Sequence, residues 1–218
     1  NGASLGDFNA TNFAQLVASV GPHLTWICIE EGFQKRMGPP FWAALRDARK
    51  LSHLLVDNIP KGLSVSDVEP LAQLRGSLEQ LSLCGQSSDC GNPSVGPRRF
   101  PESFLGFSKL ETLVLKFHFG IKAIPVGLSN LKKLQVLSVG GCDLRSLPKE
   151  LGALTQLKVL DVGWNEALGA SPDDVALPKE LKGMKSLSKL YFANCGLRRV
   201  PAFVRELCSL REIWLQDK

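Results

Sequence analysis

Groups that could support catalysis or bind a metal are scattered along this chain of 218 residues. Its three histidines share no spacing, and no serine or cysteine lies in a nucleophile motif. Gly140-Gly141 lacks the remainder of a phosphate-binding loop. A metal site built from Cys28, His53 and Cys84 would need groups from three distant segments to converge. We therefore expect no enzyme, no metal and no cofactor, and favour a binding protein.

The residues with binding character stand at positions that a leucine pattern leaves open. Leu134-Gln-Val-Leu-Ser-Val139 is followed by a bend and then by Leu147-Pro148, Leu151, Leu154 and Leu157. In general form this is L-x-x-L-x-L-x-x-(N/C)-x-L followed by L-P-x-x-L-x-x-L-x-x-L, and it recurs later in the chain. A fixed period of this kind indicates stacked repeats, each too small to bury its apolar face alone.

Prolines set the register of these repeats. Five prolines each stand nine residues before the opening leucine of the next turn: Pro101, Pro125, Pro148, Pro178 and Pro201. Because proline wastes no backbone donor at the first residue of a helix, each is expected there, starting a short helical return. Extended upstream, the register predicts eight turns, which open at Leu24, Leu51, Leu78, Leu110, Leu134, Leu157, Leu187 and Leu210.

Each turn is expected to contain a short strand and a return segment. Leu-x-Leu alternation is the period of a strand with one buried face, and successive strands should stack in parallel. The Asn/Cys position holds His118, Cys142, Asn165 and Cys195, whose polar atoms are expected to satisfy backbone groups of neighbouring turns. Longer helices are predicted at 40–49 and 68–74, and a first amphipathic helix with the apolar stripe Phe13, Leu16, Val17 and Val20.

These motifs resemble the leucine-rich-repeat family over about Leu24 to Leu215. The Leu-Pro return and the cysteines in the Asn position are similar to intracellular members, namely plant nucleotide-binding leucine-rich-repeat immune receptors and Ras-group leucine-rich-repeat scaffolds. The resemblance implies an α/β solenoid: a curved right-handed superhelix of about eight turns, with a parallel inner sheet and short helices or 3-10 turns on the convex side. One domain is expected over 1–218, with a partial first turn at 1–23, irregular longer turns at 24–109 and regular Leu-Pro turns at 110–218.

In such a solenoid, the residues between the framework leucines face the concave side. Aromatic and apolar side chains with a few charges form binding hot spots, and the predicted partner-binding patch is Val114, Phe117, Val136, Val159, Asp161, Trp164, Lys189, Tyr191 and Trp214. A secondary acidic corner is predicted from Glu30, Glu31 and Asp57. Two alternatives stay open. Phe117 and Trp164 could fold over the strand ends as framework, and Trp214 could pack against a following turn.

The predicted function is a non-enzymatic protein–protein interaction module that binds its partner through the concave face. One alternative is a structural subunit of a large assembly, held by its ends, loops and convex side. Another, from the resemblance, is the sensor domain of an intracellular immune receptor. Neither end carries the polar cap that terminal repeats need, so a longer chain or a covering partner is expected.

Charge, apolar runs and cysteines narrow the partners and the compartment. The net charge of +5 comes entirely from residues 110–218 without a dense basic run, so no nucleic acid is expected. No apolar run approaches the roughly 18 residues of a membrane span, and the first residues show no signal peptide. Cys142 and Cys195 fit reduced core thiols, which favours an intracellular location, the cytoplasm or an organelle interior. Cys84 and Cys90 could still bridge a loop.

Overall fold

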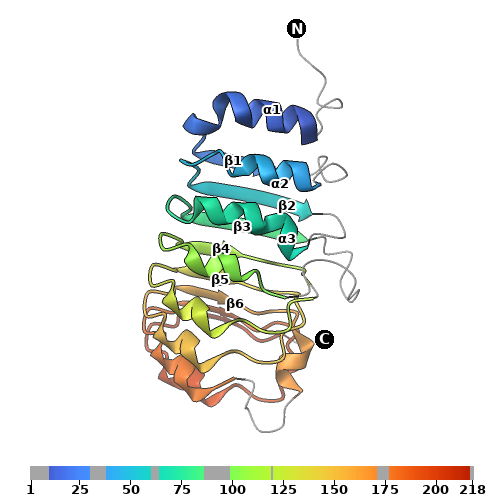
Figure 1. Cartoon of the computed structure of the whole chain (residues 1–218). Helices are drawn as coiled ribbons and strands as arrows, with labels where there is room; N and C mark the ends of the chain where they lie inside the picture. Colours follow the sequence, from blue (N-terminus) through green and yellow to red (C-terminus); the bar gives the residue numbers. More distant parts are fainter. Residues whose placement is uncertain are drawn as a thin grey trace.

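The eight predicted strands form one parallel sheet in chain order. The computed structural model describes residues 10–29, 38–59, 64–85, 99–118, 120–170 and 177–216. Figure 1 shows the strands stacked from the N-terminal to the C-terminal end: β1 Trp26–Ile29, β2 His53–Ile59, β3 Gln80–Gly85, β4 Thr112–Val114, β5 Val136–Ser138, β6 Val159–Asp161, β7 Lys189–Tyr191 and β8 Glu212–Trp214. Each strand begins two residues after a predicted opening leucine, which confirms the eight turns.

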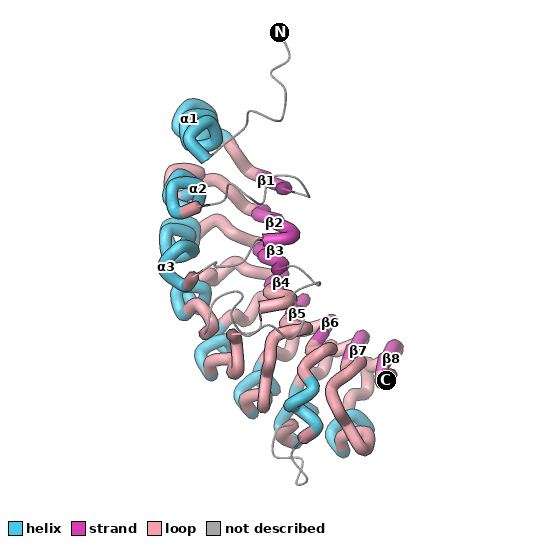
Figure 2. Tube along the Cα trace, turned by 90° about the vertical axis from the view of Figure 1, so that its right-hand side faces the viewer, coloured by secondary structure: helices cyan, strands magenta, loops and turns pink. Residues whose placement is uncertain are grey.

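The return segments are short helices on the outer side of the curve. They are α1 Ala10–Val20, η2 Gly21–His23, α2 Pro39–Leu45, α3 Val65–Val68, η4 Glu69–Leu74, η6 Glu102–Gly106, η7 Val126–Asn130, η8 Lys149–Ala153, η9 Glu166–Gly169, η10 Lys179–Gly183 and η11 Ala202–Glu206. In Figure 2 the helices follow the outer side of the bend and the strands the inner side. The molecule is therefore the curved α/β solenoid that the sequence predicts.

Strand pairing aligns the inner framework residues of all eight turns. Leu54 lies beside Leu81 in the ladder, and Leu137 beside Leu160, without a change of register along β3 to β8. A bulge interrupts the β2–β3 pairing between Val56 and Ile59. Because side chains alternate between the two faces of a strand, one in-register stack buries the inner leucines of β2 to β7 and turns the residues between them toward the concave side, where Ser82 and Ser138 are nonetheless buried.

A single continuous core fills the space between the sheet and the helices. The framework residues from Leu51 to Phe192 are almost fully buried, whereas Ile213 and Leu215 of the last turn are exposed, and buried aromatic side chains complete the core. Phe104 stacks on Phe107 with ring centroids 5.3 Å apart, and the Trp42 side chain in α2 is completely buried. Complete burial of such a side chain stabilises the fold by about 1.5–3 kcal/mol relative to its exposure.

In four of the turns, the residue at the Asn/Cys position joins the turn to the one before it. The imidazole Nε2 of His118 donates to the carbonyl of Leu83 (2.9 Å), and the thiol of Cys142 donates to the carbonyl of Leu115 (3.1 Å). Cys195 and Asn165 donate to the matching carbonyls of their preceding turns. The expected structural hydrogen bond of His118 is thus confirmed.

The prolines occupy a different helix position from the predicted one. Pro101, Pro125, Pro148, Pro178 and Pro201 are N-cap residues, one place before the first helical residue. Their carbonyls accept the first helical hydrogen bond, as Pro148 does from the amide of Leu151 (3.1 Å). The fixed φ of proline matches the N-cap values of −57° to −70°, so the residue is favoured there by its ring geometry and not by its missing donor.

The first third of the chain differs from prediction in its helices. The expected long helix at 68–74 is a short α3 followed by the 3-10 helix η4, because Pro70 interrupts the α-helical hydrogen bonds. In α1 only part of the predicted stripe is buried: Phe13 stacks on Phe41 with centroids 4.4 Å apart, whereas Leu16 and Val20 are exposed. Phe13 and its buried neighbour Val17 therefore form a narrower apolar face than expected.

Candidate functional site

In five of the described turns, one residue with an unusual backbone conformation lies at the edge of the concave face. Four residues after the inner leucine, the backbone turns into the left-handed region: φ is between 52° and 64° at Asn58, Phe117, Gly141, Trp164 and Asn194. The amide of this residue continues the ladder beyond the strands, as Trp164 does by donating to the Ala193 carbonyl (2.7 Å). Asparagine and glycine suit this conformation, whereas bulky side chains rarely adopt it.

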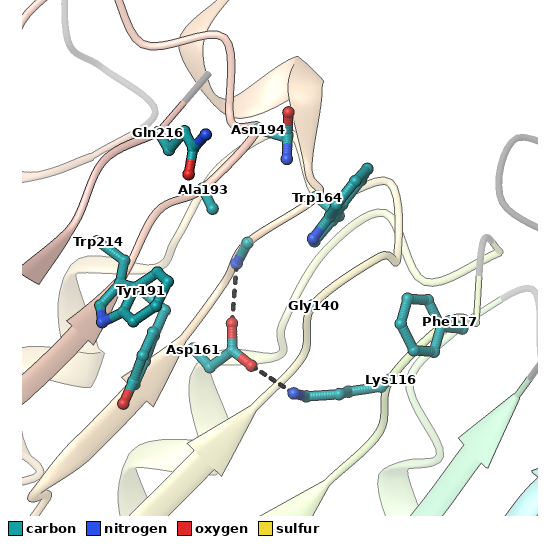
Figure 3. A pocket seen from close by; sticks show the side chains of 11 residues that line it. Lys116, Phe117, Gly140, Asp161, Trp164, Tyr191, Ala193, Asn194, Trp214 and Gln216 are labelled. Carbon is teal, nitrogen blue, oxygen red and sulfur yellow. Dashed lines mark hydrogen bonds and ion pairs between the residues drawn. The ribbon is translucent and has the colours of Figure 1, made fainter. Parts of the chain in front are cut away.

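A pocket of about 400 Å³ lies at this edge, between the turns of β4 and β8. Figure 3 shows how its walls converge from five successive turns. The lining residues are Lys116, Phe117, Gly140, Asp161, Gly163, Trp164, Tyr191, Ala193, Asn194, Trp214 and Gln216. Its volume falls within the roughly 300–1,000 Å³ of ordinary ligand sites.

Asp161 joins three turns on the side of the pocket nearest β4. Its Oδ2 accepts from the hydroxyl of Ser138 (2.8 Å) and lies 2.7 Å from the Lys116 ammonium, while its Oδ1 accepts from the Gly163 amide (3.1 Å). The dashed lines in Figure 3 mark the ion pair with Lys116 and the hydrogen bond from the Gly163 backbone N–H. Since the Asp161 carboxylate is mostly buried and fully paired, the charge of Lys116 is neutralised within the chain.

Glu212 organises the opposite side of the pocket. Its carboxylate lies 2.9 Å from the Lys189 ammonium and accepts from the Tyr191 hydroxyl (2.8 Å) and the Trp214 indole N–H (3.0 Å). The Lys189 hydrogen bond, followed by those from Tyr191 and Trp214, lowers the pKa of Glu212 to about 2. The same carboxylate raises the pKa of Lys189 and of Tyr191. At neutral pH Glu212 is therefore ionised and holds three side chains of the predicted patch in place.

The structure brings most of the predicted patch together. Five of its members line the pocket: Phe117, Asp161, Trp164, Tyr191 and Trp214. Lys189 pairs with Glu212 beside the pocket, and Val114, Val136 and Val159 are half-buried on the inner faces of β4 to β6. The binding role of these residues remains a prediction.

Two alternatives from the sequence can be compared with the side-chain positions. The Phe117 ring lies against the backbone of Gly141, where an added Cβ would stand 2.5 Å from ring Cδ1, so Phe117 has a framework contact. Trp164 is 46% exposed and Trp214 is 52% exposed. Trp164 thus leaves a large ring surface uncovered, which a purely structural role does not require. Trp214 lies on β8, the last described strand, so its packing against a following turn stays an open alternative.

Sequence reasoning did not select several lining residues. Lys116, Asn194 and Gln216 lie in the pocket, and Glu212 orders its aromatic wall. All four stand at positions that face the concave side or follow directly after a strand, so the repeat register was the signal that could have found them. Their specific hydrogen bonds depend on curvature and rotamers, which the register does not fix.

Of the predicted acidic corner, the structure describes only Asp57, which does not line this pocket. Glu30 and Glu31 lie outside the described residues, and Asp57 is exposed at the end of β2. Among the described residues there is no group of three His, Cys, Asp or Glu side chains that could hold a metal. Cys84 is a free thiol whose pKa is raised by burial, and Cys90, its possible disulfide partner, lies outside the described residues.

Comparison with known families decides the classification. A family model described as a leucine-rich repeat region matches residues 103–214, just over half of the chain. The chain belongs to the leucine-rich-repeat family. This fold is a general protein-interaction module, and its members are typically non-enzymatic. No helix within the described ranges has the length and apolar composition to cross a membrane.

Relatives of this leucine-rich-repeat chain are distant. TMV resistance protein N of Nicotiana glutinosa is 24% identical in an alignment of 168 residues, and the match covers 56% of this chain and 15% of that protein. The chain therefore spans a small part of this curated relative.

Solved structures share its fold at similarly low identity. A leucine-rich-repeat protein of Leptospira interrogans has 24% identity and a TM-score of 0.54, over 81% of this chain and 46% of its own. Internalin C2 of Listeria monocytogenes has 16% identity and a TM-score of 0.55, and the match covers 92% of this chain and 83% of the internalin chain. The Arabidopsis receptor kinase HAESA was solved with the peptide hormone IDA and the co-receptor SERK1. It has 20% identity and a TM-score of 0.53, and the match covers 81% of this chain and 32% of the HAESA chain.

Proposed function

We propose that this chain is a recognition module that binds a partner protein through the pocket at the edge of its concave face. The observation that carries the proposal is the choice of residue at the left-handed position. Asn58, Gly141 and Asn194 adopt this conformation with little strain, whereas Phe117 and Trp164 adopt it at a cost of about 1–2 kcal/mol each. Both bulky residues line the pocket.

Strain of this kind is kept where a side chain is needed in one place. Almost half of the Trp164 surface stays exposed, so a large part of its ring is open to a partner. Tryptophan and tyrosine are also the residues that most often dominate protein–protein binding energy. Trp164, Tyr191 and Trp214 therefore suit a recognition surface better than a scaffold.

A second candidate function follows from the tobacco relative. TMV resistance protein N is named for resistance to a pathogen, and this chain resembles a 168-residue part of it. The chain would then be the sensing segment of an intracellular immune receptor. The buried thiol of Cys142 supports a reducing compartment, since it donates to a backbone carbonyl and burial raises its pKa to about 12.

Selection from a phage-displayed library of random peptides tests the proposed pocket. The enriched peptides are synthesised, and their dissociation constants are measured by fluorescence anisotropy against the wild-type chain and the double variant Trp164→Ala/Tyr191→Ala. We expect the double variant to bind at least tenfold more weakly. Trp26→Ala is the matched control, since Trp26 is 63% exposed on β1, far from the pocket.

Two outcomes would overturn the proposal. Peptides that bind the double variant as tightly as the wild type would place recognition elsewhere, and would favour a subunit held by its ends, loops or convex side. Equal weakening by Trp26→Ala would show that the loss is not specific to the pocket.

A further inference from the structure

The charged groups at the pocket border are already neutralised within the chain. Lys116 pairs with Asp161 at 2.7 Å, and Lys189 pairs with Glu212 at 2.9 Å. A charged ligand group would have to compete with these contacts, and a partner's charge would face no net opposite charge. The border therefore gives no advantage to an acidic, basic or phosphate-bearing group.

The aromatic wall presents carbon and not polar atoms to the pocket. The Tyr191 hydroxyl and the Trp214 indole N–H both donate to Glu212, so neither N–H nor O–H donor remains available to a ligand. Their rings are tilted by 36° with centroids 6.1 Å apart. Figure 3 shows both rings on one side of the pocket and those of Trp164 and Phe117 across from them. An apolar group that enters between them is enclosed by ring surface.

The rim nearest β8 offers two uncommitted amides. The side chains of Asn194 and Gln216 line the pocket and make no hydrogen bond to another described residue. Each carries two N–H donors and a carbonyl acceptor, which match the acceptor and donor of a peptide group. The backbones of these two residues are held together, because the backbone N–H of Asn194 donates to the backbone carbonyl of Gln216 (2.9 Å).

We propose that the pocket takes one uncharged aromatic or large aliphatic side chain from an extended segment of a partner protein, whose main chain is held by the Asn194 and Gln216 amides. This inference rests on the proposed function and names the chemistry of its ligand. A volume of about 400 Å³ accommodates a side chain together with its flanking peptide groups. Selectivity comes from apolar burial, and the amides add direction and register.

Peptides enriched on the full chain test the anchor chemistry. In each binding peptide, single positions are replaced by alanine, and the position with the largest loss defines the anchor. We expect the anchor to be Trp, Phe, Tyr, Leu, Ile or Met, and the dissociation constant to change less than threefold between 50 and 500 mM NaCl. Paired border charges give little long-range attraction for salt to screen.

A matched pair of variants tests the amides. Asn194→Gly keeps the left-handed backbone but removes the amide, and should weaken binding about threefold to tenfold, as loss of a net hydrogen bond does. Asn58→Gly makes the same replacement at the equivalent position of β2 and should leave binding unchanged.

The outcomes separate this inference from the proposed function. A charged anchor that still depends on Trp164 and Tyr191 would overturn the inference and keep the proposed function, as would an unaffected Asn194→Gly. If peptide binding does not change in Trp164→Ala/Tyr191→Ala, both this inference and the proposed function are overturned. Tight binding of a fluorescent random RNA 12-mer, lost in Trp164→Ala/Tyr191→Ala, would assign the rings to base stacking and contradict a protein ligand.

Discussion

At the scale of single residues, the left-handed position that follows the strand distinguishes residues that serve the fold from residues that suit binding. Five described turns adopt a left-handed backbone there, and asparagine or glycine stands at three of these five positions. The sequence identified Phe117 and Trp164 as departures from the leucine pattern. It could not reveal their strain, because φ at that position is a property of the folded turn.

Replacement of Trp164 by asparagine should leave the fold intact. Relief of the left-handed strain, about 1–2 kcal/mol, offsets the loss of a half-exposed ring, so urea unfolding followed by circular dichroism should give a free energy within about 1 kcal/mol of wild type. The reverse change, Asn58→Trp, should cost about 1 kcal/mol or more. A loss above about 3 kcal/mol in Trp164→Asn would mean that Trp164 is framework.

His118 should make stability depend on pH. Burial lowers its pKa from the ordinary 6.5 to about 4, so the folded chain keeps it neutral while the unfolded chain binds a proton. The free energy of unfolding should fall as pH decreases from 6.5 to 4, by about 3 kcal/mol from this group. The variant His118→Asn removes the titrating group and gives this turn the asparagine that Asn165 provides at the equivalent position of its own turn. If its pH profile between 6.5 and 4 equals that of the wild type, another group carries the effect.

At the scale of elements, the Asn/Cys position locks neighbouring turns together, and Asn165 does so most completely. Its Oδ1 accepts from the amides of Cys142, Asp143 and Leu144, and its Nδ2 donates to the carbonyls of Val139 and Val162. The side chain is fully buried, so water cannot replace these partners.

Asn165→Ala should therefore be among the most damaging single changes in the regular turns. It leaves buried amides without partners, at about 1–3 kcal/mol for each unsatisfied group, and should lower the free energy of unfolding by at least about 3 kcal/mol. Cys195→Ala, which removes only weak thiol donors, should cost about 1 kcal/mol. Equal losses in equilibrium urea unfolding would contradict this ranking.

The elements were largely predictable because the signal was periodic. Opening leucines from Leu24 to Leu210 located all eight strands, and the five prolines located the regular return helices. Helix boundaries were less accurate: the prolines proved to be N-caps, and η4 replaced part of an expected α-helix. A spacing of nine residues is the same for either helix position, and only the hydrogen bonds distinguish them.

At the scale of the whole molecule, curvature creates the site. The stack of β4 to β8 brings residues 100 positions apart, such as Lys116 and Gln216, to one pocket. Leucine periodicity predicts that these residues share a face. It does not predict that Glu212 fixes the Tyr191 and Trp214 rings, since that contact depends on side-chain rotamers in adjacent strands.

The four tryptophans of the chain allow the most direct test of the pocket. Trp164 and Trp214 line it, Trp26 is exposed on β1, and Trp42 is buried in the core. Protein labelled with 5-fluorotryptophan is titrated with an enriched peptide and followed by ¹⁹F NMR, with signals assigned by single Trp→Phe variants. We predict that the Trp164 and Trp214 resonances shift while those of Trp26 and Trp42 stay in place. A shift at Trp26 with Trp164 and Trp214 unchanged would contradict recognition through this pocket.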